Sequence, residues 1–225
     1  MKATENEEIR DEIKKEFQLE RMILFSDAVF AIVITLMAIE IRIPETEELT
    51  TENLGRAMRH LIPTLLAYVV SFIFIGSIWY QHLKMFSLLK DYDKGLVVRN
   101  MLLLFFIGLF PFTASLITRA KGQMLPFFIY LFMILFCVIA QYILYHYIVV
   151  GRPSIRLNTD LTEHKEELHR RKVAVIGFSS AAVLIFVTYT LIPDPELKTL
   201  SMLWMMAFPI AFKIWGRKKK PNKTA

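Results

Sequence analysis

Six long apolar blocks recur along this chain of 225 residues, and each is close to the length that crosses a lipid bilayer. A helix needs about 20 mostly apolar residues to span the hydrocarbon core. Hydrophobic residues make up 55% of the chain and charged residues 21%, which does not favour a soluble domain. We predict an all-α membrane protein, a single repeat of six transmembrane helices, at about 22–42, 61–83, 97–117, 124–150, 173–192 and 200–215.

The polar segments suggest a division of the chain into three parts. Residues 1–20 are strongly charged and lack the apolar core of a secretory signal, so we expect a cytoplasmic N-terminal segment. Residues 21–215 form the expected six-helix transmembrane domain, and residues 216–225 form a basic tail. The stretch around 159–172 also contains many charged residues, and we expect it to be a solvated helical connector.

Lysine and arginine are distributed unevenly between the two sides of such a protein. Basic residues collect on the cytoplasmic side of membrane proteins. With six spans and both termini cytoplasmic, all but six of the 27 lysines and arginines fall on that side, the exceptions being Arg42, Arg56, Arg59, Arg119, Lys121 and Lys198. We therefore expect a multi-pass protein of the cell (plasma) membrane with both ends in the cytoplasm.

Composition and spacing argue against several other classes of protein. The net charge of +6 favours an anionic lipid surface as partner, and nucleic acid is not expected because the aromatic residues lie inside the apolar blocks. The single cysteine, Cys137, cannot form a disulfide within the chain. The histidines are scattered, so neither an enzyme nor a metal site is predicted; they are His60, His82, His146, His164 and His169.

The first block, "RMILFSDAVFAIVITLMAIEI", carries a carboxylate close to its beginning. At 100° per residue, Asp27 lies on the side of the helix opposite an apolar stripe. That stripe consists of Phe25, Ala28, Ile32, Leu36 and Ile39, with Thr35 at its edge. An intramembrane carboxylate faces protein or a water-filled cavity, so the stripe faces lipid, another helix or an oligomer axis. Candidate partners for the polar side are Trp79, His82 and Asn100.

The residues Arg21-x-x-x-Phe25-Ser26-Asp27 at the start of this block resemble the signature of the lysosomal and endosomal potassium-channel family and its prokaryotic homologues. The family lacks the usual Thr-Val-Gly-Tyr-Gly filter, as does this chain. The resemblance implies a homotetramer of six-span subunits with the first helix lining a potassium pore. It also implies that no cofactor is needed, since K⁺ and other monovalent cations are the permeant species.

The resemblance further implies a role for each position of the first helix. Ile32, Leu36 and Ile39 would form an apolar constriction or gate, which excludes water when narrow. Thr35 would influence selectivity, with a modest preference for K⁺ over Na⁺. Arg21, Phe25, Ser26 and Asp27 would form a structural network, supported by Trp79, His82 and Asn100.

Two other classes of function stay open from the sequence. A proton- or cation-coupled secondary transporter would use Asp27 and His82, together with Glu40, as titrating carriers. A structural scaffold would also explain an apolar stripe, although it would not require the signature.

Overall fold

The chain folds into a bundle of long helices. The computed structural model describes residues 2–39, 41, 54–119, 124–157 and 160–192. The helices are α1 (Lys2–Ile39), α2 (Leu54–Phe86), α3 (Lys94–Gly108), α4 (Phe110–Arg119), α5 (Met124–His146) and α6 (Thr162–Leu191). A π-helical turn, η1 (Tyr147–Gly151), and a 3-10 turn, η2 (Pro153–Ile155), follow α5. The described residues contain no β-strand, in agreement with the all-α prediction.

Among the described residues, five helical stretches are long and apolar enough to cross a membrane. They are Ile9–Ile39, Thr64–Phe86, Lys94–Ile117, Met124–Gly151 and Thr162–Leu191. Each overlaps one of the first five predicted spans. The sixth predicted span, 200–215, and the basic tail, 216–225, lie outside the described residues, as does Glu40.

The third predicted span is two helices rather than one. Helix α3 ends at Gly108 and α4 begins at Phe110, with Leu109 between them. Pro111 explains the break, because proline has no N–H for the helical ladder and its ring crowds the carbonyl four residues earlier. The sequence contains this proline, but membrane helices also tolerate proline without breaking, so the break could not be predicted from it.

Two other boundaries also differ from the sequence expectation. Helix α1 runs through residue 20 without interruption, so the charged N-terminal segment and the first span form one continuous helix. The polar stretch after residue 160 begins α6 and is not a separate connector. Most of its described residues are exposed or half-exposed, as expected for a solvated helix, but its Arg171 is buried, with 8% of its surface exposed.

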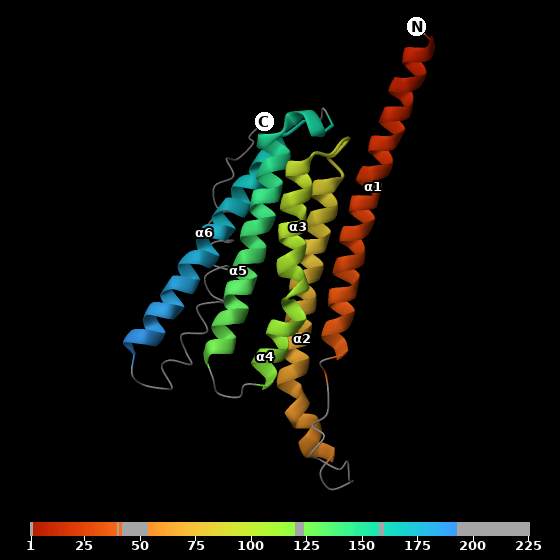
Figure 1. Cartoon of the computed structure of the whole chain (residues 1–225). Coiled ribbons are helices and arrows are strands. Elements are labelled where there is room, and N and C mark those ends of the chain that lie inside the picture. The colour runs from red at the N-terminus through yellow and green to blue at the C-terminus, as the bar shows by residue number, and fades with distance from the viewer. Residues whose placement is uncertain (1, 40, 42–53, 120–123, 158–159, 193–225) are drawn as a thin grey trace, which may run out of the picture.

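The packing places α1 and α6 at opposite edges of the bundle (Figure 1). Helix α1 packs against α2, α3 and α4, whereas α6 packs against α5. The N-terminal part of α1 projects beyond the end of the bundle (Figure 1). The position of α1 at an edge leaves one of its faces uncovered by the other described helices.

Candidate pore-lining helix

The membrane part of α1 has two chemically different sides. Phe30, Val33 and Met37 are buried in the bundle, with 1–3% of their surface exposed. By contrast, Ile32, Leu36 and Ile39 are 56%, 45% and 56% exposed. Phe25, at the start of the same stripe, is 50% exposed. The helical periodicity that separates the two sets is 3.6 residues per turn, so the exposed stripe is continuous along the helix.

Three buried polar side chains attach the other side of α1 to α2 and α3. Asn100 of α3 donates from Nδ2 to the Ser26 hydroxyl of α1 at 2.8 Å, and its Oδ1 lies 2.9 Å from Nε2 of His82 in α2. The Ser26 hydroxyl donates in turn to the carbonyl of Met22 at 2.8 Å. Ser26, His82 and Asn100 are each at most 1% exposed. The three helices therefore share one continuous chain of hydrogen bonds.

The geometry of this chain of hydrogen bonds determines which ring nitrogen of His82 carries the proton. Because Asn100 uses its amide nitrogen toward Ser26, its oxygen must accept from His82, which places the imidazole proton on Nε2. The other ring nitrogen, Nδ1, is buried without a hydrogen-bond partner in the described structure. The ring stacks on Phe86, with centroids 4.0 Å apart, and lies 5.5 Å from the Phe30 ring. The two aromatic rings therefore place apolar surface against the imidazole.

Asp27 takes a separate partner from α2. Its carboxylate accepts a 2.9 Å hydrogen bond from the indole N–H of Trp79. Arg21 does not join this contact: within the described residues it makes no ion pair with Asp27, and its guanidinium lies 5.9 Å from the ring centre of Phe17 on the preceding turn. The structure thus brings Asp27 and Trp79 together, whereas Arg21 is exposed and does not contact this pair.

Thr35 lies on the uncovered side of α1. Its hydroxyl is within hydrogen-bond distance of the carbonyls of Ala31 and Ile32, at 3.0 and 2.9 Å. The hydroxyl hydrogen is therefore satisfied by the helix itself, and the oxygen lone pairs remain available as acceptors. In the described part of the chain, no group of three His, Cys, Asp or Glu side chains is arranged to hold a metal ion.

Several buried polar contacts between helices were not predicted. Gln141 of α5 donates to the carbonyl of Ile78 at 3.1 Å, and the hydroxyls of Ser71 and Tyr130 lie 2.6 Å apart. Gln141 is a polar residue inside an apolar block, which is the signal that identified Asp27. Applied to every block, the same rule would have found it. The contact of Arg171 with the Tyr145 ring, 4.3 Å from its centre, has no such local signal.

Comparison with known proteins finds sequence similarity in the first helices. The family model of the endosomal/lysosomal potassium channel TMEM175 matches residues 21–111, a segment that contains the two polar contacts of α1. A potassium channel of Chryseobacterium sp. (strain P1-3) is 29% identical over 151 residues, which are 67% of this chain and 72% of the relative. A potassium channel of Chamaesiphon minutus is 36% identical over 99 residues, which are 44% of this chain and about half, 49%, of the relative.

The fold agrees over a longer stretch than the sequence. The crystal structure of a lysosomal potassium-selective channel TMEM175 homolog from Chamaesiphon minutus superposes with a TM-score of 0.70 and 24% identity. The superposition covers 89% of this chain and 99% of that one. The chain is thus similar in sequence to TMEM175-type channels over residues 21–111, and its fold matches that of a prokaryotic TMEM175 homolog over most of its length.

Proposed function

We propose that this chain is the subunit of a potassium-permeable cation channel of the plasma membrane, a passive pore and not an enzyme, with both termini cytoplasmic. The observation that supports this most is the division of α1. One side is hydrogen-bonded into the bundle through Ser26, and the other side presents the exposed residues Ile32, Leu36 and Ile39. The names of the two bacterial relatives as potassium channels support K⁺ as the permeant ion.

A pore along α1 requires several copies of the chain. One helix cannot enclose an axis, and soluble and membrane homo-oligomers close by rotational symmetry. Helix α1 lies at the edge of the bundle, where a symmetry axis can run alongside it (Figure 1). We propose a homotetramer, with four copies of α1 around the axis and the remaining helices facing neighbours and membrane lipids.

The side chains of the stripe explain how such a pore closes. Four copies of Ile32 would form an apolar ring that offers water no hydrogen bond, so the ring blocks conduction by dewetting when it is narrow. Leu36 and Ile39 extend the apolar section by one and two further turns. Thr35 places a hydroxyl oxygen beside the ring. Partial dehydration at this point favours K⁺ over the more strongly hydrated Na⁺, and we propose a modest selectivity with no cofactor.

The signature residues have a structural role in this proposal. Ser26 and Asp27 bond to side chains of α3 and α2 and thereby set the rotation of α1 about its own axis. A rotation of one residue, 100°, would move Ile32 away from the axis. His82, Asn100 and Trp79 hold these two residues from the neighbouring helices.

The alternative of a coupled transporter is disfavoured by the same geometry. Its carriers would be Asp27 and His82, and both have hydrogen-bond partners within the bundle. His82 is 0% exposed. Neither therefore reaches the exposed stripe, where an ion would pass.

A crosslinking and flux experiment tests the proposal. Ile39→Cys in a Cys137→Ala background is expected to form disulfide-linked dimers between subunits under mild oxidation. Met37→Cys is the matched control, since its position is 3% exposed within the bundle. Purified protein in liposomes is expected to pass K⁺ without saturation and without a coupling ion. Saturable, proton-dependent flux from a monomer would overturn the channel and favour the transporter.

A further inference from the structure

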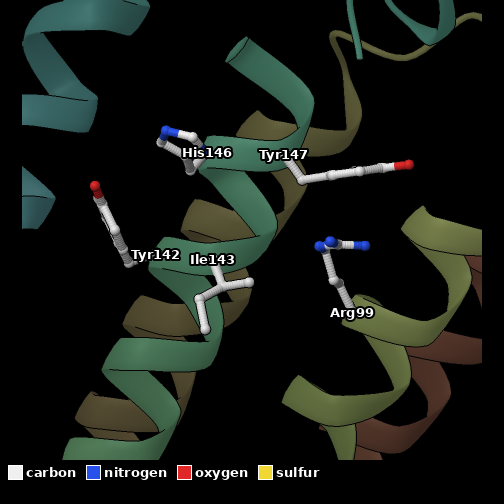
Figure 2. A pocket seen from close by; sticks show the side chains of 5 residues that line it. All are labelled: Arg99, Tyr142, Ile143, His146 and Tyr147. Carbon is white, nitrogen blue, oxygen red and sulfur yellow. The ribbon is translucent and has the colours of Figure 1, made fainter. Parts of the chain in front are cut away.

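A second surface feature lies on α5 and α3, away from the exposed stripe of α1. A cavity of about 220 Å³ is lined by Arg99, Tyr142, Ile143, His146 and Tyr147. Arg99 comes from α3, and the others come from the end of α5 and the start of η1. Figure 2 shows Arg99 on one side of Ile143, and Tyr142 and His146 on the other. The hydrogen-bond donors of Arg99 on one side, and of Tyr142 and His146 on the other, therefore flank the apolar side chain of Ile143.

The guanidinium of Arg99 is held in place by its neighbours. Its Nη1 donates to the carbonyl of Gly95 at 2.9 Å, and its central carbon lies 3.9 Å from the centre of the Tyr147 ring. Arginine carries five N–H donors in a fork that fits phosphate. The helix carbonyl and the ring fix the plane of the fork, and most of its donors remain for a ligand.

Tyr147 is itself anchored by Asp93, which lies just before the span that begins at Lys94. The Tyr147 hydroxyl donates to Oδ2 of Asp93 at 2.6 Å, and the same oxygen lies 3.5 Å from Arg152. Partial burial raises the pKa of Asp93, but hydrogen bonds from Tyr147 and the Leu96 N–H, together with Arg152, lower the pKa below its ordinary value. Asp93 therefore stays ionised and paired, and the ring under Arg99 does not move freely. A Cβ at Gly95 would overlap the Tyr147 hydroxyl, so this close approach requires glycine.

The surface that continues from the cavity along α5 is apolar and exposed. Phe132, Phe136 and Ile143 are 44%, 44% and 39% exposed and share one face, spaced by four and seven residues. The Phe136 ring stacks on Phe106 of α3, with centroids 5.2 Å apart. His146 follows Ile143 by three residues on the same face, so the surface changes from apolar to polar within one turn.

The order of these groups matches the layers of a bilayer surface. Tyrosines are enriched where hydrocarbon meets headgroups, and basic pockets between membrane helices on the cytoplasmic side bind anionic lipid headgroups. The helix ends that line the cavity, the start of α3 and the end of α5, lie at the end of the bundle from which the N-terminal part of α1 projects (Figure 1). The distribution of basic residues predicts that this end is cytoplasmic.

We propose that the cavity lined by Arg99 and His146 binds the phosphate of an anionic phospholipid, whose acyl chain lies over Ile143, Phe136 and Phe132. Arg99 contacts the phosphate with its charged fork. His146 and Tyr142 donate to the phosphate or to headgroup hydroxyls. The continuous apolar stripe favours a lipid over free phosphate, because free phosphate gains nothing from it. This proposal is independent of the channel function.

Lipid retention measured by native mass spectrometry tests the site. The purified full chain is incubated with phosphatidylglycerol or with phosphatidylcholine in mixed micelles. Wild type is expected to retain more phosphatidylglycerol. Arg99→Gln is expected to reduce that retention by about tenfold, the factor that loss of about 1.4 kcal/mol gives, because a direct hydrogen bond to a charged group contributes at least that much. His146→Gln is expected to reduce it by a smaller factor. Phosphatidylcholine retention should change less.

Two controls separate a pocket from a general effect of charge. Lys90→Gln removes one exposed charge from the segment that precedes α3 and should leave retention unchanged. His146 is exposed, so its variant tests the site even if Arg99→Gln unfolds. Equal loss in Lys90→Gln would overturn the proposal. Displacement of phosphatidylglycerol by millimolar inorganic phosphate, or retention unchanged in both pocket variants, would also overturn it.

Discussion

The two sides of α1 differ in their contacts: one is hydrogen-bonded to neighbouring helices, and the other is apolar and exposed. On one side, Ser26 and Asp27 meet hydrogen-bond donors from α3 and α2 at 2.8 and 2.9 Å. On the other, Ile32 is 56% exposed, and no helix of the described residues covers it. Burial of a polar group in a membrane protein requires a partner, so the polar side determines how α1 packs. These hydrogen bonds do not involve the exposed apolar side, so its contacts depend on the proposed assembly with other copies of the chain.

This difference separates stability from conduction. Side chains on the side of α1 that is hydrogen-bonded to α2 and α3, the bonded side, should affect folding and assembly. Side chains on the exposed stripe should affect ion flow and have less effect on stability. Each substitution below tests one side while the other serves as its control.

The largest effect is expected at the centre of the bonded side. Asn100→Ala leaves the Ser26 hydroxyl and His82 Nε2 buried without their shared partner, at a cost of about 1–3 kcal/mol. The yield of assembled protein and its resistance to denaturing detergent should fall. Ser77→Ala is the control, because the Ser77 hydroxyl bonds only within its own helix, to Phe74. Wild-type stability in Asn100→Ala would show that the hydrogen-bond chain does not hold α1.

The next effect is expected on the exposed stripe. Ile32→Asn supplies hydrogen-bond groups to water in the proposed constriction, so the ring should stay wet and basal K⁺ flux should rise. A barrier lower by only about 1.4 kcal/mol gives about a tenfold rise. Ile34→Asn is the matched control, since Ile34 is half-buried against the core. It should reduce stability without opening the pore. A leak in Ile34→Asn and none in Ile32→Asn would place the pore on another face.

Much of this organisation could be predicted from local sequence. Apolar blocks give the first five spans, and an acid inside one of them indicates that this helix has a polar side. Trp79, His82 and Asn100 were candidates because they are polar or amphipathic and lie near the same end of neighbouring spans. The detailed pairing was not predictable: Asn100 bonds to Ser26 and His82, whereas Asp27 bonds to Trp79.

The remaining features depend on contacts between residues distant in the sequence. Arg171 lies in a run of charged residues, and only the positions of Tyr145 and Met85 bury it. The cavity beside Arg99 is formed by the start of α3 and the end of α5, nearly fifty residues later in the chain. A local pattern of charge or hydropathy cannot report either arrangement.

A smaller effect is expected at Thr35, at the edge of the exposed stripe. Thr35→Val keeps the volume and the branched Cβ but removes the hydroxyl oxygen. Loss of one such polar contact is worth about 0.5–1.5 kcal/mol, so the K⁺/Na⁺ permeability ratio should change by about two- to tenfold. Reversal potentials with unequal K⁺ and Na⁺ measure the ratio. Thr190→Val serves as control, because Thr190 is another exposed threonine bonded to its own helix. An unchanged ratio would remove Thr35 from the ion path.

The smallest effect is expected for Asp27→Asn, and it distinguishes two accounts of the bonded side. If Asp27 belonged to a buried ionic network with Arg21, removing its charge would cost about 3–5 kcal/mol. In the structure its partner is the neutral indole of Trp79, 2.9 Å away, and Arg21 lies against Phe17. Asparagine keeps an oxygen that accepts from the same N–H, so the loss should be about 1 kcal/mol, the difference between a charged and a neutral hydrogen bond. Asp27→Leu removes the acceptor and should cost more, while Trp79→Phe should reproduce the Leu variant and add little to it in the double variant. Thermal or detergent-induced dissociation of the four proteins measures these differences. A loss for Asp27→Asn as large as for Asp27→Leu would mean that the charge itself holds the helix, through a partner that the neighbouring subunit supplies.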